Sequence, residues 1–215
     1  MDEKTFRRHY EKFFDWLRFN SVLFELWGRT KGGIVLAALD CSFISKSGKS
    51  TYGLDKFWSG VLGKPKKGLE ISVLALIDVS SASAWALDVT QTPPCLSRSD
   101  KAGYSRVDFY IEQILDCLPY LKEVTYFVAD GFYAKCKIIK TLCDNNKHLI
   151  TKLRPDSNLL LPFEGEHPKG KRGPKTKFGD KAVFNDLSKW LYVGPDEKYS
   201  YLEVYSQVLW SPKFE

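Results

Sequence analysis

Two apolar segments that each run into an aspartate constrain the fold of this chain more than any other feature. The first is Leu36–Asp40 (LAALD), and the second, Tyr126–Asp130 (YFVAD), comes much later in the chain. Continuous apolar runs are typical of central strands that are buried on both faces. Two such strands, each with a carboxylate at its carboxyl end, are what a divalent-metal site on an α/β sheet requires.

The composition sets limits on the class of protein. The 215 residues are enough for one domain, or for one domain with an insertion. Lys and Arg outnumber Asp and Glu by 32 to 26, an excess that by itself favours polyanionic partners only weakly. The five scattered cysteines form no Cys-x-x-Cys pair, which disfavours a zinc site and favours reduced thiols. Neither a signal peptide nor an apolar run of about 18 residues is found, so we expect no membrane contact.

The spacing of apolar residues predicts the order of the elements. An amphipathic helix is predicted over residues 5–19, strands over 34–43, 69–80, 84–92, 124–129 and 148–153, and helices over 104–118 and 132–145. The order β-β-β-α-β-α-β predicts an α/β fold with a ribonuclease-H-like mixed sheet. We expect an N-terminal helical segment (1–33), a catalytic core (34–160), and a basic arm with the start of a β-rich insertion after the fifth strand (161–215).

In this strand order the first and fourth strands are neighbours, so Asp40 and Asp130 are expected near one another. Two carboxylates suit Mg²⁺, which prefers oxygen ligands and keeps some positions for water and substrate. A pair of such ions can activate the attacking oxygen and stabilise the leaving oxygen of a phosphodiester. The alternative for Asp130 is a helix cap, because it precedes Gly131 and a predicted helix. Asp40 has no following helix to cap.

Six motifs carry a resemblance to a known family. They are ALDCSF, SKSGKSTYGLDKFWSG, KPKKGLEISVLALIDV, QTP, ADGFYAK and HLITKLRPDSNLLLPFEG, between about Ala38 and Gly165. In this order the chain resembles a DDE-type transposase of bacterial insertion sequences. The resemblance implies that Asp40 and Asp130 are the first two metal-binding catalytic acids. It also implies two Mg²⁺ (or Mn²⁺) ions, cleavage of transposon ends, strand transfer into target DNA, and a cytoplasmic, nucleoid-associated protein.

The third acid of that family is a glutamate in a Tyr-x2-Arg-x3-Glu-x6-Lys setting, which this sequence does not contain. We therefore expect a transposase truncated before this residue. One alternative is an inactive DNA-binding remnant that interferes with the full-length transposase, as a homodimer or a heteromer. Another is a metal nuclease that takes its last ligand from Glu70, Asp78 or Glu215.

Basic residues supply the candidate DNA contacts. One group lies between the first two predicted strands, where the alternative is a solvated loop; a second follows the acids or ends the last core strand; a third forms the Gly- and Pro-rich arm. These residues are Lys46, Lys49, Lys64, Lys66, Lys67, then Lys135, Lys152, Arg154, and in the arm Lys169, Lys171, Arg172, Lys175 and Lys177. Trp58 and Trp85 are predicted as core residues.

Overall fold

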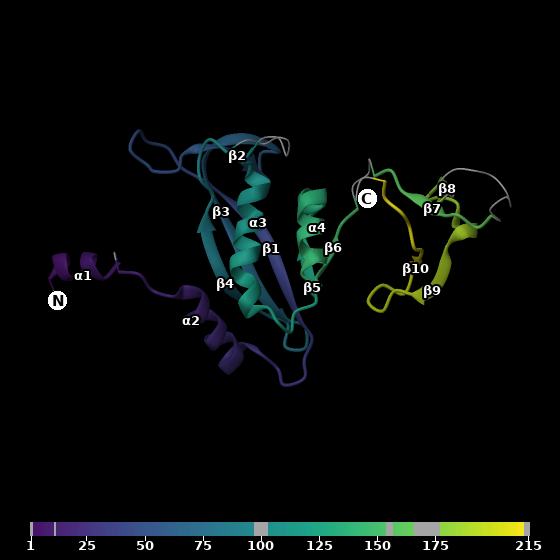
Figure 1. The fold of residues 1–215 in the computed structure, drawn as a ribbon, viewed down its shortest axis with the longest axis horizontal. Helices are drawn as coiled ribbons and strands as arrows, with labels where there is room; N and C mark the ends of the chain where they lie inside the picture. The colour runs from purple at the N-terminus through teal and green to yellow at the C-terminus, as the bar shows by residue number, and fades with distance from the viewer. Residues whose placement is uncertain (1, 11, 97–102, 154–156, 166–176, 213–215) are drawn as a thin grey trace. The chain divides into compact units, whose positions relative to one another are not determined.

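The computed structural model describes residues 2–10, 12–96, 103–153, 157–165 and 177–212 (Figure 1). Its contacts divide the chain into two compact units, Met1–Lys152 and Leu153–Glu215. The first unit holds a six-stranded sheet with its helices, and the second holds short strand pairs. The three-part division predicted from the sequence stays a prediction.

The sheet of the first unit is mixed. Its main path runs β2-β3-β1-β5-β6, and β4 also pairs with β3. Pairing is antiparallel around β3 and parallel between β1, β5 and β6. The bounds are Val35–Ser45 for β1, Asp55–Ser59 for β2, Lys64–Asp78 for β3, Ser83–Gln91 for β4, Tyr126–Ala129 for β5 and His148–Thr151 for β6. This topology confirms the predicted ribonuclease-H-like α/β class, with one strand, β2, added to the predicted order.

Two helices, α3 (Arg106–Cys117) and α4 (Cys136–Asp144), cover one face of this sheet (Figure 1). Alternate residues of β3 are buried from Gly68 to Asp78, as expected where every second side chain faces the helices. Leu74 packs there with Ile114 and Phe127, and all three are almost fully buried. Ser105 begins α3 with a capping box that it forms with Asp108.

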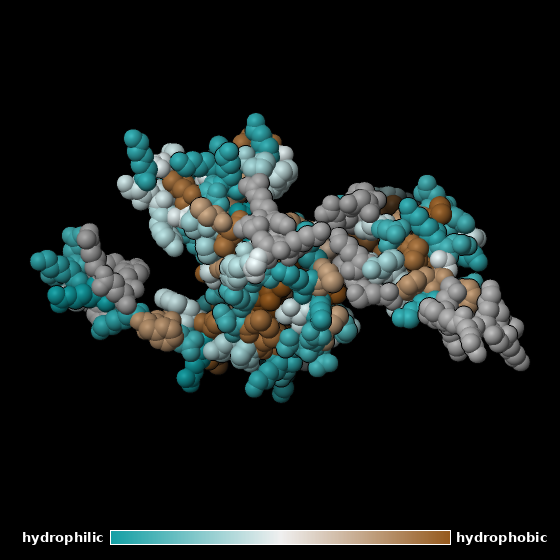
Figure 2. Space-filling model, turned by 45° about the horizontal axis from the view of Figure 1, so that its top comes forward, coloured by the Kyte–Doolittle hydropathy of each residue, from teal (hydrophilic) through white to brown (hydrophobic). Residues whose placement is uncertain are grey.

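The opposite face of the sheet is more open. Asp40 of β1 pairs with Val73 of β3, and across the parallel strands Ala38, Val128 and Ile150 share this face. Ile150 is 49% exposed, and Asp40 is exposed as well. Figure 2 shows hydrophobic residues exposed among hydrophilic ones on the surface.

The helix predicted over residues 5–19 is wrong as a single element. The chain forms α1 (Glu3–Tyr10) and α2 (Trp16–Leu23), and η1 (Phe24–Gly28) follows. The break comes before Asp15, whose carboxylate accepts a hydrogen bond from Arg18 N at 3.0 Å and so starts a new helix. Phe24 reaches the core beside β4, where Gly28 is packed so closely against Trp85 that a Cβ would lie 2.6 Å from its ring.

The segment between the first two predicted strands is not only a loop. Residues 55–59 form β2, and β3 begins at Lys64, so Lys64, Lys66 and Lys67 lie on a strand. The two strands make a ribbon in which Phe57 is fully buried and Trp58 is 60% exposed. The prediction that Trp58 is a core residue is therefore wrong, whereas Trp85 is partly buried against the core.

The second unit is β-rich, as predicted for the segment after the fifth core strand. β7 (Leu160–Pro162) pairs with β8 (Phe178–Lys181), and β9 (Leu191–Pro195) pairs with β10 (Glu203–Ser206). An isolated antiparallel bridge joins Leu160 of β7 to Trp210, which follows β10 in the chain. The short turn η4 (Leu187–Lys189) precedes β9.

Candidate active site

The parallel pairing of β1 with β5 sets Asp40 beside Asp130. The last pair in the register joins Leu39 to Ala129, and the aspartates are the next residue on each chain segment. Neighbouring strands run about 4.8 Å apart, so the two carboxylates leave backbones that are close together. From Asp40 onward β1 pairs with β3 alone and continues to Ser45. β5 thus stops pairing with β1 at this point, and from Asp40 onward one side of β1 has no strand partner among the described residues.

Asp130 also caps the turn that follows it. Its Oδ1 accepts a hydrogen bond from Phe132 N at 2.9 Å, at the start of η3 (Gly131–Tyr133). Its carbonyl oxygen accepts a bond from the Thr151 hydroxyl at 2.9 Å. The cap role that was the alternative for Asp130 is therefore present. Because the cap uses Oδ1, a cation at Oδ2 is compatible with it, and the two roles do not exclude each other.

A buried polar cluster lies on the other side of β1 from Asp40. The Tyr133 hydroxyl donates to Cys41 Sγ at 2.9 Å, and the Tyr110 hydroxyl donates to Glu70 Oε1 at 2.6 Å. The rings of Tyr110 and Tyr133 have centroids 5.6 Å apart. The Tyr133 contact connects the turn after Asp130 to the residue after Asp40, and so holds the two acid-bearing segments together.

This cluster supplies support and not reactive groups. Burial raises the pKa of Tyr133, and the neighbouring Cys41 and, more weakly, the charge of Asp40 raise it further. Burial also raises the pKa of the Cys41 thiol. Both groups keep their protons near neutral pH, so neither Tyr133 nor Cys41 is a reactive group at the site.

No third carboxylate joins the pair within the described residues, where no group of three His, Cys, Asp or Glu side chains is placed to hold a metal ion. Glu70 is three positions from Val73, the partner of Asp40, so it lies on the other face of β3. Asp78 lies at the far end of β3, where its carboxylate accepts from Thr30 N at 2.6 Å. Both are wrong as ligands beside Asp40, and Glu215 lies outside the described residues.

The predicted DNA-contacting residues fall into separate places. Lys46 and Lys49 are exposed just after β1, and Lys64, Lys66 and Lys67 are exposed on the β2–β3 ribbon. Lys152 is exposed and follows Thr151, the register partner of Ala129, so it lies next to Asp130 in the sheet order. Lys135 is the residue before α4, and its Nζ lies 5.7 Å from the Phe132 ring centroid.

The remaining predicted contacts lie in the other unit or outside the description. Lys177 is exposed next to β8 in the second unit. Arg154, Lys169, Lys171, Arg172 and Lys175 lie outside the described residues.

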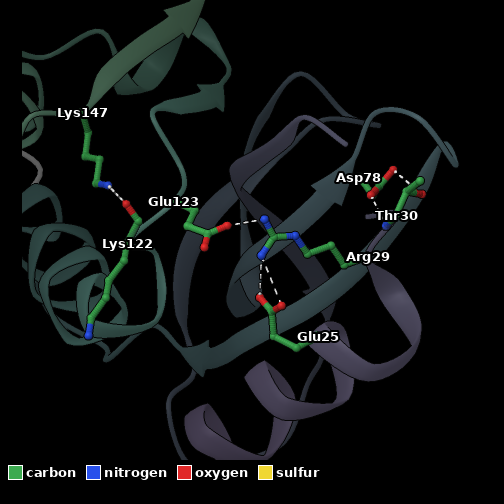
Figure 3. A network of polar contacts seen from close by, with 7 residues as sticks. All are labelled: Glu25, Arg29, Thr30, Asp78, Lys122, Glu123 and Lys147. Atoms are coloured by element: carbon green, nitrogen blue, oxygen red, sulfur yellow. Dashed lines mark hydrogen bonds and ion pairs between the residues drawn. The ribbon is translucent and has the colours of Figure 1, made fainter. Parts of the chain in front are cut away.

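A cavity of about 240 Å³ lies at the opposite edge of the sheet from the aspartates. Val35, the first residue of β1, and Val124, which precedes β5, line it. Arg29 joins Glu25 and Glu123 beside it, and Lys147 donates to the Lys122 carbonyl oxygen nearby (Figure 3). Since this edge carries the amino ends of the parallel strands, the cavity is separate from the candidate site.

The sequence matches a family model described as DDE superfamily endonuclease over residues 11–203. The match covers most of the chain and extends over both units. This chain belongs to the DDE superfamily endonuclease family. The resemblance to DDE-type enzymes that the motifs indicated is confirmed at this level, and the family supports nucleic-acid cleavage as the general activity.

Solved structures add little to the DDE assignment. Two crystal structures of Ciona intestinalis endonuclease V, bound to DNA containing an inosine followed by a ribo-adenosine, are similar to this chain. Their sequence identities are 16% and 15%, and their TM-scores are 0.31 and 0.29. The alignments cover 64% and 70% of this chain and 55% and 58% of the endonuclease V chains. The DDE chain thus spans little more than half of these structures, and the likeness carries no functional argument. A comparison with curated proteins gives no match.

Some residues with structural or functional importance in the DDE chain were not identified from the sequence. Tyr133 and Cys41 belong to the quoted motifs ADGFYAK and ALDCSF, yet their contact appears only when β1 and β5 are placed side by side. Lys56 and Trp58 are exposed on one face of β2. The alternation of Lys56, Phe57 and Trp58 was a signal for a strand with one open face.

The described part of the chain contains no helix that is long and apolar enough to span a bilayer.

Proposed function

We propose that this chain is a DDE-type transposase unit whose metal-dependent cleavage of DNA is centred on Asp40 and Asp130. The observation that carries the proposal is the β1–β5 register, which brings the two acids to adjacent strands where the sheet opens. Members of the family generally use divalent metals, and the two carboxylates suit Mg²⁺ or Mn²⁺ as oxygen donors. Such ions supply Lewis-acid stabilisation of the charge that develops during phosphodiester cleavage.

The finer parts of the proposal are the substrate and the assembly. We infer that the substrates are transposon ends and target DNA of an insertion sequence, and that the chain acts as a homodimer or as a heteromer with another transposase chain. Exposed lysines on both sides of the acids support a polyanionic substrate. Lys46 and Lys49 follow β1, and Lys152 lies in the strand beyond Asp130.

A second candidate function is a DNA-binding protein without cleavage activity. The observation that favours it is that no third carboxylate joins Asp40 and Asp130 among the described residues. Two carboxylates alone would offer divalent ions fewer oxygen ligands than the three-acid site that the resemblance implies. In this reading the chain binds DNA, or pairs with a complete transposase, without cutting.

A nicking assay separates the two functions. The purified chain is incubated with supercoiled plasmid and Mg²⁺ or Mn²⁺, beside Asp40→Asn, Asp130→Asn and the control Asp116→Asn, which changes an exposed acid on α3. We expect metal-dependent nicking that Asp40→Asn and Asp130→Asn reduce by at least about 100-fold and that Asp116→Asn leaves intact. DNA binding without nicking in the unaltered chain would favour the second function, and nicking that survives both substitutions would contradict the assigned site.

A further inference from the structure

The β2–β3 ribbon extends beyond the part of the sheet that β1 covers. Along β3, pairing with β1 starts at Gly68, which is opposite Ser45 at the end of β1, so Lys64–Lys67 pair only with β2. In this stretch Trp58 is directly opposite Pro65, and Lys56 is directly opposite Lys67. Directly opposite residues of an antiparallel pair share a face. One face of the ribbon therefore presents one indole ring and two ammonium groups together.

The other face of the ribbon is fastened to the body of the unit. Phe57 is fully buried, and the Arg106 guanidinium lies 4.6 Å from its ring centroid at the start of α3. The Asp55 carboxylate lies 3.8 Å from the same guanidinium and accepts a hydrogen bond from Cys95 N at 2.9 Å. These contacts on the inner face fix the orientation of the ribbon, so Trp58 on the outer face points to solvent and is 60% exposed.

The outward face of the ribbon continues into the face that carries Asp40. Pro65, Lys67, Leu69, Ile71 and Val73 alternate along β3 on one side, and Val73 pairs with Asp40. Eight residues separate Pro65 from Val73, a span of about 26 Å at about 3.3 Å per residue. At 3.4 Å per base step this corresponds to roughly eight nucleotides of a stacked strand.

We propose that this ribbon face binds an unpaired segment of a DNA strand, with a base stacked on Trp58 and phosphates contacted by Lys56 and Lys67. An exposed aromatic ring flanked by cations is the combination that single-stranded nucleic acid requires, because every base has a π-face and every nucleotide carries a phosphate. A duplex hides its base faces, so it can use the lysines but not the indole. The inference rests on the proposed function for the nature of the substrate, and it adds a binding residue away from the metal site.

The test uses fluorescence anisotropy of a labelled oligothymidine of about 12 nucleotides and of a labelled duplex, with the whole chain. Trp58→Leu keeps an apolar side chain opposite Pro65 but removes the π-face, and Trp58→Phe restores an aromatic ring. We expect Trp58→Leu to weaken oligothymidine binding at least about fivefold and duplex binding less than about twofold, and Trp58→Phe to recover most of the loss. The control Trp27→Ala removes an indole that is 69% exposed on η1, and it should change neither affinity.

The lysines are tested through the dependence of binding on salt. Lys56→Ala and Lys67→Ala should each lower the slope of log K against log salt for oligothymidine by about 0.7, and the control Lys122→Ala, at the opposite edge of the sheet, should not. If the Trp58→Leu variant binds oligothymidine as tightly as the unaltered chain, the inference is wrong. Duplex binding by the unaltered chain would in that case still support the proposed function. A chain that binds neither oligonucleotide would overturn both.

Discussion

The contact between Glu70 and Tyr110 leads to a prediction that separates structure from catalysis. Glu70 is an acid close in sequence to the site, but it is 6% exposed on the helix-covered face and accepts a hydrogen bond of 2.6 Å from the Tyr110 hydroxyl. Glu70→Gln keeps the shape and one acceptor oxygen but replaces a bond to a carboxylate by a bond to a neutral amide. We expect it to destabilise the fold and to leave the affinity for Mg²⁺ unchanged.

The magnitude follows from two local changes. A hydrogen bond to a charged group contributes about 1.5–3 kcal/mol, against about 1 kcal/mol for a neutral one. The new amide also buries an N–H group beside an almost fully buried tyrosine, which adds to the cost. The sum is about 1–3 kcal/mol, or a decrease in Tm of about 2–12 °C for a chain of this length. Tyr110→Phe should cost a similar amount, since it removes the other partner.

Chemical denaturation of the two single variants and of the double variant completes a cycle. The double variant should be less destabilised than the sum of the single ones, by about 0.5–3 kcal/mol, because both changes remove the same bond. Calorimetric titration with Mg²⁺ then gives the metal affinity of each folded variant beside Asp40→Asn. A loss of metal affinity of tenfold or more in Glu70→Gln, with stability unchanged, would refute the reasoning and make Glu70 a metal ligand.

Two further predictions concern groups away from the candidate site. Backbone N–H groups of Thr30 and Ser81 donate to the Asp78 carboxylate and hold its pKa at about 2, below its usual 3.8. The stability that the ionised Asp78 contributes is therefore present above about pH 4 and is lost as the pH falls from about 4 to about 2. The difference in Tm between the unaltered chain and Asp78→Asn should therefore shrink over that range, and a constant difference would argue against it. Lys147 Nζ donates hydrogen bonds to the carbonyl oxygens of Leu121 at 2.8 Å and Val124 at 2.5 Å. Lys147→Met should therefore lower the free energy of unfolding, measured by urea denaturation, by about 2–4 kcal/mol. A decrease below about 0.5 kcal/mol would show that these bonds contribute little to stability.

The strands that were predicted from the sequence are those whose own residues carry the signal. The segments of β1, β3, β4, β5 and β6 are apolar enough to be recognised alone, and their order was sufficient for the fold class. β2 was missed because its five residues include Asp55 and Lys56 and its partner segment begins Lys64-Pro65-Lys66-Lys67. Such a ribbon owes its strand geometry to pairing and to the burial of Phe57, which a local pattern does not contain.

The candidate site was predictable in part for a similar reason. Asp40 and Asp130 stand at the ends of recognisable apolar runs, so their meeting follows from the strand order. Which face of β3 Glu70 occupies depends on the register with β1, and a shift of one residue would reverse it. The helix over 5–19 failed because an amphipathic pattern can be shared by two helices, and only the cap formed by Asp15 marks the break.

The change in the neighbours of β1 explains why the acids and the ribbon belong to one surface. Up to Leu39 the strand lies between β3 and β5, where a charged side chain on either face would lie against neighbours on both sides. From Asp40 onward the β5 side is open, so a carboxylate there is hydrated and reachable by a substrate. β3 continues beyond β1 in the same direction and presents Lys67 and the partner of Trp58 on the same face. Asp40 and the ribbon residues therefore lie along one face of β3, with Tyr52 and Gly53 packed beside Gln91 and Leu69 between them. A DNA strand whose phosphate lies at Asp40 and Asp130 must extend past this segment to reach Trp58, so any effect of Trp58 should depend on the length of the unpaired strand.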